Sequence, residues 1–388
     1  MNRTVRLLLR PTLEQEQALL GTLVRFTDCF NAVCEAGWQD RQKNGVELHK
    51  RTYRGLKDSQ PGLVSDLIIQ ARVKATEALA SAIALENKGK KVGQPKSKLC
   101  PARYNDHTYR LSWQASTVNM SSVAGRLAIL FDAPACAAKY LGHPTATADL
   151  VHRKGRFWLH VVVDVPTPEV QPTADVVGVD LGIKRPAVTS NNKFLGERRW
   201  RNLEARTFKL KRALQSKGTK SAKRHLRKLS GKQLRRRRDH DHVLSRRIVQ
   251  ATPAGATIAL ENLTGIRGRA KQRNKGGHQR RLHCWSFAQL RTFIEYKAEE
   301  TGIRVVLVDP RNTSKACNRC GHVHRSNRPS QSVFRCKSCG CELNADLNAA
   351  RNIRLKHLAS VGMSDAGAPS STGVSSRSPL GSGASRLL

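Results

Sequence analysis

Two pairs of cysteines near the C-terminal end place the tightest constraint on what this chain can fold into. Cys317 and Cys320 form one CxxC pair, Cys336 and Cys339 form a second, and fifteen residues separate the two pairs. Four thiolates at this spacing can hold one Zn²⁺ ion tetrahedrally on a small ribbon. A glycine follows each pair, and a positive φ there turns backbone N–H groups toward sulfur. We therefore predict a closed four-cysteine zinc site whose role is structural rather than catalytic.

The alternative for these cysteines is a pair of disulfides, which persist in oxidising compartments. The apolar run at the N-terminus is short and is broken by Arg6 and Arg10, so we expect no signal peptide. The sequence contains no stretch of eighteen apolar residues, so we also expect no membrane-spanning helix. Both expectations favour a reducing compartment, and therefore a metal site over disulfides.

The charge of the chain is strongly positive. It has 388 residues, with 69 Lys and Arg against 29 Asp and Glu, a formal net charge of +40. Such a charge opposes compaction unless a polyanion neutralises it, and nucleic acid is the usual partner. Residues 197–247 hold twenty basic and four acidic residues, and residues 267–281 add seven basic ones. We expect these segments to bind phosphates. The segment between the cysteine pairs contains Arg325, Arg328 and Arg335 without an acid, so we expect the ribbon to contact phosphate too.

Three carboxylates stand out because acidic residues are scarce. Asp180 ends the apolar run VVGVD, Glu261 ends TIALE, and Asp346 lies near the start of a predicted helix, five residues past the last cysteine. A carboxylate at the exit of a buried strand is costly to desolvate unless a cation compensates. Two Mg²⁺ ions about 4 Å apart, held by such carboxylates, can hydrolyse a phosphodiester.

Each carboxylate also has an ordinary structural explanation. Asp180 could cap a turn, Glu261 could pair with an arginine, and Asp346 could be a helix-start acid favoured by the helix dipole. The order and context of the three together favour the metal site.

Hydrophobic periodicity predicts strands and helices in both halves of the chain. The first half is expected to hold a strand over residues 3–10, a helix capped by Thr12 and Gln15, a helix over 66–85, and a β-rich region over 104–165. Leu13, Leu20, Val24 and Phe30 help form an apolar stripe that predicts the first helix. Elements predicted in the second half are strands within 175–190, 256–261 and 304–309, and helices over 197–247, 286–301 and 344–359.

Four segments of the second half resemble a known family. GVDLGIK (178–184), IALENLTGI (258–266), TSKACNRCG (313–321) and RCKSCGCELNADLNAARNI (335–353) occur in the order found in TnpB proteins, the transposon-encoded nucleases related to type V CRISPR effectors. RPTLEQ (10–15) and GKKVGQPK (89–96) are similar to that family as well. The sequence departs from many relatives in reading Glu-Leu-Asn-Ala before Asp346, where they carry His-Asp-Arg, and in the extra thiol of Cys341.

The resemblance implies an α+β multidomain fold. A wedge-like β-barrel would be followed by a RuvC-like α/β nuclease domain of RNase H type, with a four-cysteine zinc ribbon inserted in it. The composition of the last residues, rich in Ser, Gly and Pro, predicts a disordered tail. The expected boundaries are 1–10 and 100–170 for the barrel, 11–99 for a helical recognition insert, 173–310 and 342–362 for the nuclease, 311–341 for the ribbon, and 363–388 for the tail.

The resemblance also implies a function, an RNA-guided, Mg²⁺-dependent endonuclease. Asp180, Glu261 and Asp346 match the catalytic positions and would bind two Mg²⁺ ions. The partners would be a guide RNA made from the transposon end and double-stranded target DNA, cut next to a short transposon-adjacent motif in a prokaryotic cytoplasm, in association with the nucleoid. Alternatives are an RNase H-fold transposase, a non-cleaving RNA-guided repressor, and a zinc-ribbon DNA-binding protein without enzymatic activity.

Overall fold

The computed structural model describes residues 1–196, 198–271 and 282–365. The chain forms two compact units, Met1–Pro166 and a second that begins at Thr167. Most of the expected disordered tail and part of the basic segment 267–281 lie outside the described residues. Within the described ranges, no helix is long and apolar enough to cross a membrane.

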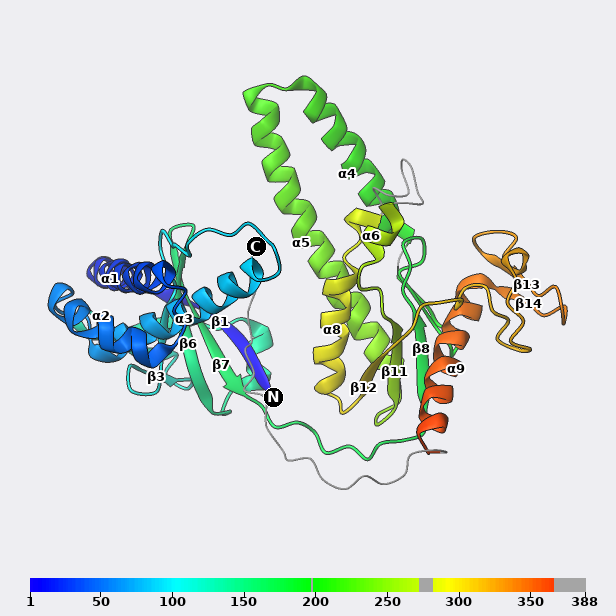
Figure 1. Cartoon of the computed structure of the whole chain (residues 1–388), viewed down its shortest axis with the longest axis horizontal. Helices are drawn as coiled ribbons and strands as arrows, with labels where there is room; N and C mark the ends of the chain where they lie inside the picture. Colours follow the sequence, from blue (N-terminus) through cyan, green and yellow to red (C-terminus); the bar gives the residue numbers. More distant parts are fainter. Residues whose placement is uncertain (197, 272–281, 366–388) are drawn as a thin grey trace. The chain divides into compact units, whose positions relative to one another are not determined.

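The first unit is built on a seven-stranded antiparallel sheet that curls into a nearly closed barrel (Figure 1). The strand order is β2-β6-β7-β1-β5-β4-β3. Two tyrosines bridge the open side, because the hydroxyl of Tyr104 in β2 donates to the backbone oxygen of Ser121 in β4, and that of Tyr109 in β3 donates to the backbone oxygen of Ala146 in β6, each at 3.0 Å. The strands are β1 (Asn2–Arg10), β2 (Ala102–Tyr104), β3 (Tyr109–Ser112), β4 (Thr117–Ser122), β5 (Gly125–Asp132), β6 (Thr145–Arg153) and β7 (Arg156–Asp164).

Three helices lie between β1 and β2 in the chain and pack on the barrel (Figure 1): α1 (Leu13–Gln39), α2 (Gly45–Ser59) and α3 (Ser65–Glu86). The predicted capping box at the start of α1 is confirmed. Thr12 Oγ1 accepts from the backbone N–H of Gln15 at 3.3 Å, and Gln15 Oε1 accepts from that of Thr12 at 3.1 Å. The chain therefore enters α1 with two of its free N–H groups satisfied.

The helix that the apolar stripe predicts is present, but of the four stripe residues only Phe30 is buried. Leu13 is 72% exposed, and Leu20 and Val24 are exposed as well. Two apolar stripes adjoin on this helix, about one residue or 100° apart. Contact with α3 decides which stripe is buried, and a single-helix pattern does not contain that information. The buried set is Leu19, Leu23, Phe26, Phe30 and Val33.

The second unit has a five-stranded mixed sheet in the order β10-β9-β8-β11-β12. Its three strands β8, β11 and β12 run parallel, and β9 returns antiparallel beside β8. The buried strands carry apolar side chains on both faces, as parallel strands do when helices cover both sides. The strands are β8 (Val176–Asp180), β9 (Ala187–Thr189), β10 (Phe194–Leu195), β11 (Thr257–Glu261) and β12 (Arg304–Val308).

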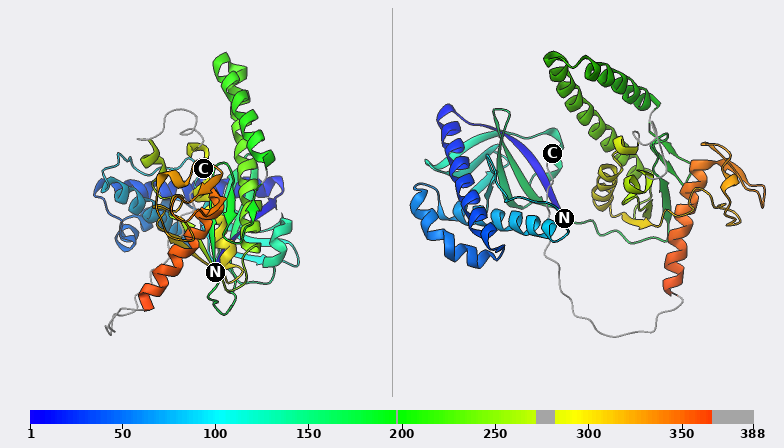
Figure 2. Two further views of the ribbon diagram at one scale, coloured as in Figure 1. Left: turned by 90° about the vertical axis from the view of Figure 1, so that its right-hand side faces the viewer. Right: turned by 45° about the horizontal axis from the view of Figure 1, so that its top comes forward.

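Helices cover both faces of this sheet (Figures 1 and 2). On one face Leu244 and Ile248 of α5 (Lys220–Gln250) and Ile294 of α8 (Phe287–Glu299) pack on alternate residues of β8 and β11. Ile353 of α9 (Ala345–Asp365) packs on the other face. α9 extends beyond residue 359, where the sequence predicts its end. The basic segment between β10 and β11 forms a helical hairpin, because α4 (Arg198–Lys217) packs against α5.

Candidate active site and metal centre

Two of the three candidate carboxylates end neighbouring parallel strands. Asp180 is the last residue of β8 and Glu261 is the last residue of β11. The two strands pair in register up to Val179 and Leu260, so the carboxylates follow at the same edge of the sheet. Carboxyl ends of parallel strands are where open α/β sheets bind ligands.

The third carboxylate comes from the first turn of α9. Asn344 Oδ1 accepts from the backbone N–H groups of Asp346 at 3.0 Å and Leu347 at 3.3 Å, which starts the helix at this point. α9 lies directly on β8 because Gly178 has no side chain: a Cβ there would stand 2.1 Å from the backbone oxygen of Ala350. This close approach brings the buried Asp346 to the end of β8.

Electrostatic interactions link the three side chains. The pKa of Asp180 is raised well above its usual range, chiefly by burial, then by repulsion from Glu261 and Asp346, while Arg328 partly offsets the rise. Burial also raises the pKa of Glu261, against a hydrogen bond from Thr313 Oγ1 to its Oε1 at 2.5 Å. Mutual repulsion of this kind is relieved by a bound cation.

Two arginines already neutralise Asp346. Arg328 Nη2 lies 3.1 Å from its Oδ1, and Arg185 Nε lies 3.8 Å from its Oδ2. Over the ranges described, only the four cysteines bring three or more possible ligand atoms within 4.8 Å of one another. The carboxylates are therefore spread more widely than ligands around one ion, although their oxygen donors are the type that Mg²⁺ prefers.

Two of the arginines predicted to contact phosphate are paired with carboxylates of this chain. Arg335 forms two hydrogen bonds with Glu342, at 2.9 and 3.0 Å, and Arg328 is held by Asp346. Neither guanidinium group is therefore free to bind phosphate unless it first leaves its carboxylate partner. The sequence gives no signal for these pairs, because each joins elements on opposite sides of a cysteine pair.

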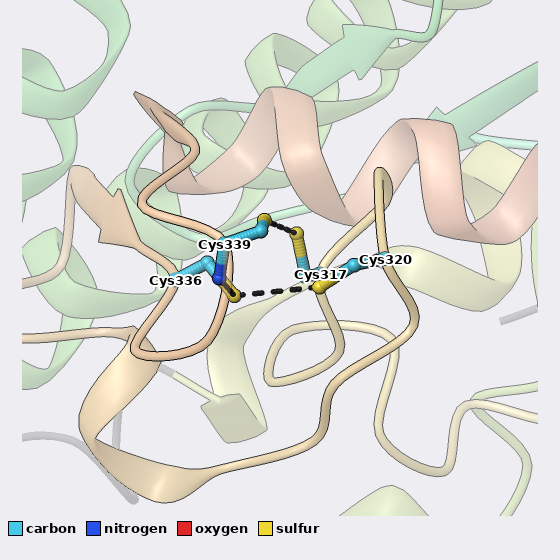
Figure 3. Close-up of side chains that lie close together, drawn as sticks. All are labelled: Cys317, Cys320, Cys336 and Cys339. Carbon is cyan, nitrogen blue, oxygen red and sulfur yellow. Dashed lines mark hydrogen bonds between the residues drawn. The ribbon is translucent and has the colours of Figure 1, made fainter.

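The four cysteines converge as their spacing predicts (Figure 3). The Sγ atoms of Cys317 and Cys339 lie 3.7 Å apart, and those of Cys320 and Cys336 lie 3.6 Å apart. Four sulfurs about 2.3 Å from a central Zn²⁺ ion would be about 3.8 Å apart, so the cluster fits zinc. The distances are far longer than a disulfide bond of about 2.05 Å.

The two cysteine turns have matching backbones. The predicted positive φ is confirmed at Gly321, with +74°, and at Gly340, with +69°. The backbone N–H of Cys339 points at Cys336 Sγ and is the main cause that lowers the pKa of that thiol to about 6. A thiolate is the form that binds a metal.

A short antiparallel hairpin encloses the second cysteine pair. Its strands are β13 (Val333–Arg335) and β14 (Glu342–Asn344), so residues 342–344 pair with the strand that precedes Cys336. β14 leads directly into α9. The ribbon and the helix that carries Asp346 are therefore continuous.

Two asparagines of α9 attach this helix to the segment around the first cysteine pair. Asn348 Nδ2 donates to the backbone oxygen of Ala316 at 2.8 Å, and Asn352 Nδ2 donates to those of Ala316 and Thr313 at 2.7 and 2.8 Å. Asn344, four residues earlier, caps the helix. This role was not predicted, although a repeat of Asn every four residues marks one face of a helix.

Comparisons with known proteins give two family matches. A family described as Cas12f1-like, TNB domain matches residues 287–353, and a family described as Probable transposase matches residues 160–264. The chain is 31% identical over 237 residues to the CRISPR-associated endodeoxyribonuclease Cas12f1 of Sulfoacidibacillus thermotolerans, covering 56% of this chain and 54% of that protein. It is 33% identical over 153 residues to a TnpB-like protein of Methanocaldococcus jannaschii, covering 39% of this chain and 54% of that protein.

A solved structure has the same fold. The protein of a Cas12f1–sgRNA–target DNA complex superposes with a TM-score of 0.63 at 17% identity, covering 88% of this chain and 83% of that one. The fold is thus the mixed α/β fold of Cas12f-type proteins. In sequence, the chain is similar to a TnpB-like protein and matches a family described as Probable transposase, in agreement with the motifs noted above. The matched part spans about half the length of these curated relatives.

Proposed function

We propose that this protein is an RNA-guided, Mg²⁺-dependent endonuclease that cuts double-stranded DNA next to a short transposon-adjacent motif. The observation that carries the proposal is the meeting of Asp180, Glu261 and Asp346 at one edge of the sheet, where burial, and then repulsion from the other two carboxylates, raises the pKa of Asp180. Clustered, partly desolvated carboxylates are costly to a fold, and a phosphodiester-cleaving metal site is a function that requires them.

The three carboxylates would hold two Mg²⁺ ions. When bound, such ions lower the pKa of a water molecule and stabilise the leaving oxygen of a phosphodiester. The chain itself supplies orientation: the hydroxyl of Thr313 holds the Glu261 carboxylate, and the Asn344 cap holds the helix that carries Asp346. Arg328 and Arg185, which neutralise Asp346, are cations that a DNA phosphate could draw toward itself.

The proposed partners are a guide RNA from the transposon end and target DNA. The net charge of +40 and the basic α4–α5 hairpin support a large polyanionic partner. The names of the relatives, an endodeoxyribonuclease and a complex with sgRNA and target DNA, support RNA and DNA as that partner. In such complexes base pairing reads the target while the protein reads duplex shape and a short motif.

The domain roles are part of the same proposal. The guide RNA and the adjacent motif would be bound by the barrel, residues 1–10 and 100–170, together with the helical insert, residues 11–99. Residues 173–310 and 342–362 would cut the DNA, and the zinc ribbon, 311–341, would hold the target strand. The protein would act in a prokaryotic cytoplasm at the nucleoid.

The test begins by sequencing the RNA that co-purifies with the full chain. The guide portion of that RNA is then replaced, and the complex is given plasmids carrying the new target beside a randomised flank, with Mg²⁺ or EDTA. Cleavage that follows the new guide, needs Mg²⁺ and selects one flank is the expected result. Joining of transposon-end DNA without RNA would identify a transposase instead. Guided binding without cleavage would identify a repressor.

A further inference from the structure

A hollow lies between the two basic helices α4 and α5, apart from the three carboxylates. Its volume is about 570 Å³, within the range of small-ligand sites. Trp200 and His240 line it, with the basic residues Arg206, Arg236 and Arg247. An aromatic surface and several guanidinium groups thus share one small space.

The two rings are stacked on each other. Their centroids are 4.4 Å apart with an interplanar angle of 17°, so Trp200 and His240 form one flat pair that joins α4 to α5. A flat aromatic surface beside cationic side chains is how proteins hold an unpaired nucleotide, since every base has a face to stack.

One atom of this pair lacks a partner. His240 Nε2 is buried and has no hydrogen-bond partner within the part of the chain that the structure describes. The other ring nitrogen, Nδ1, lies 3.3 Å from Oδ1 of Asp241, a buried carboxylate that also accepts from Ser286 and Gln289. This contact with a buried carboxylate holds the His240 ring in place beside Trp200.

We propose that this hollow binds a single unpaired nucleotide of a single-stranded nucleic acid. The base stacks on the Trp200–His240 pair, and its phosphates contact Arg206 and Arg236. Bases stacked within a duplex cannot enter, because their faces and pairing edges are occupied. The site adds an unpaired-strand contact to the proposed endonuclease, and it does not depend on the three carboxylates being catalytic.

The test measures binding of fluorescent six-residue oligonucleotides to the full chain by anisotropy. The probes are oligothymidylate, oligouridylate, and an abasic strand of equal length and charge. Stacking of one base predicts that the thymidylate or uridylate strand binds about 5- to 150-fold more tightly than the abasic strand. A preference for uridylate would point to RNA and a preference for thymidylate to DNA, and either supports the site.

Single substitutions distinguish binding in the hollow from nonspecific electrostatic attraction to the basic helices. Trp200→Ala and His240→Ala should remove most of the preference for bases, whereas Trp200→Phe, which keeps a stacking ring, should retain it and so controls for folding. Arg236→Ala should weaken all three strands more than Arg235→Ala, which removes the same charge from an exposed neighbour on α5. Equal preference for bases in the wild type, Trp200→Ala and His240→Ala would overturn the proposal, as would equal losses in the two arginine variants. Neither result would bear on DNA cleavage by the wild type. The hollow can therefore be refuted without refuting the proposed endonuclease.

Discussion

Arg328 Nη2 donates a hydrogen bond of 3.1 Å to Oδ1 of Asp346. Arg328 lies between the two cysteine pairs, and Asp346 lies in the first turn of α9. Both side chains are largely buried, with 23% and 11% exposed, so solvent screens the pair only in part. Arg328 therefore couples the cysteine cluster to the carboxylate site. We expect a substitution that disrupts the cluster also to change the position and charge balance of Asp346.

The first prediction concerns the three carboxylates. Asp180→Ala, Glu261→Ala and Asp346→Ala should each reduce guided DNA cleavage to about a thousandth or less of the wild-type rate, because each removes a ligand of the proposed metal site. RNA and target binding should remain, and are measured by filter retention. Asp175→Ala, an exposed acid just before β8, is the control and should cut normally. Full-rate cleavage by any of the three variants would refute the triad.

The second prediction concerns pH and stability. Folding raises the pKa of Asp180 above its ordinary value of 3.8, so the folded state holds the proton more tightly than the unfolded state. The resulting stabilisation is complete below pH 3.8 and is lost as pH rises through the raised pKa. In EDTA, Asp180→Asn should therefore melt above the wild type at pH 8, and the difference should shrink toward pH 4.

Addition of Mg²⁺ tests whether a bound cation removes this destabilisation. Mg²⁺ should raise the melting temperature of the wild type at pH 8, because a bound cation relieves the repulsion, and should raise that of Asp180→Asn much less. Calorimetric scans of both proteins with and without Mg²⁺ measure this. Equal shifts in the two proteins would speak against Asp180 as a metal ligand.

The third prediction concerns zinc. The wild type should contain one zinc ion per chain by atomic emission, and Cys317→Ser or Cys336→Ser should lose it, because a closed site needs all four thiolates. Through Arg328 and the asparagines of α9, these variants should also cut DNA poorly. Cys341→Ser, adjacent in sequence but outside the four-cysteine cluster, should keep its zinc. A wild type without zinc would contradict the assignment.

The fourth prediction tests the contact between β8 and α9. Gly178→Ala should cost about 1–3 kcal/mol, because the added methyl group would collide with the backbone of Ala350 and Arg354. It should also lower cleavage by moving Asp346 away from the sheet. Gly231→Ala on α5, where the nearest atom is 3.6 Å away, should be neutral or slightly stabilising. Thermal melting of both variants decides between these outcomes.

The fifth prediction concerns salt. Affinity for nucleic acid should fall about a thousandfold or more between 50 and 200 mM salt, as expected for about six or more phosphate contacts. Arg227→Gln and Lys228→Gln, at exposed positions on α5, should each reduce the slope of log affinity against log salt by about one. A flat dependence would argue against phosphate as the main contact.

Features that depend on neighbours in the sequence could be predicted. The capping box of α1, the positive φ of Gly321 and Gly340, and the convergence of the cysteines each follow from residues a few positions apart or on one hairpin. Placement of Asp180 and Glu261 at strand ends follows from short apolar runs that stop at an acid.

Features that depend on a distant surface could not be predicted. The buried side of α1 depends on α3, so an apolar stripe that includes Leu20 and Val24 does not identify it. The pairing of residues 342–344 with residues 333–335 joins strands on opposite sides of the second cysteine pair. The hollow at Trp200 exists because α4 folds back on α5.

By itself, the sequence determined the chemical groups of the protein: four thiols at the spacing of one zinc site, three isolated acids among basic residues, and a formal net charge of +40. These depend on residue identity and local spacing. Only the tertiary structure decided which acids meet, that Arg328 neutralises Asp346, and that Gly178 lets α9 lie on β8. Such contacts join residues far apart in the chain, and their geometry exists only once the sheet and its helices have packed.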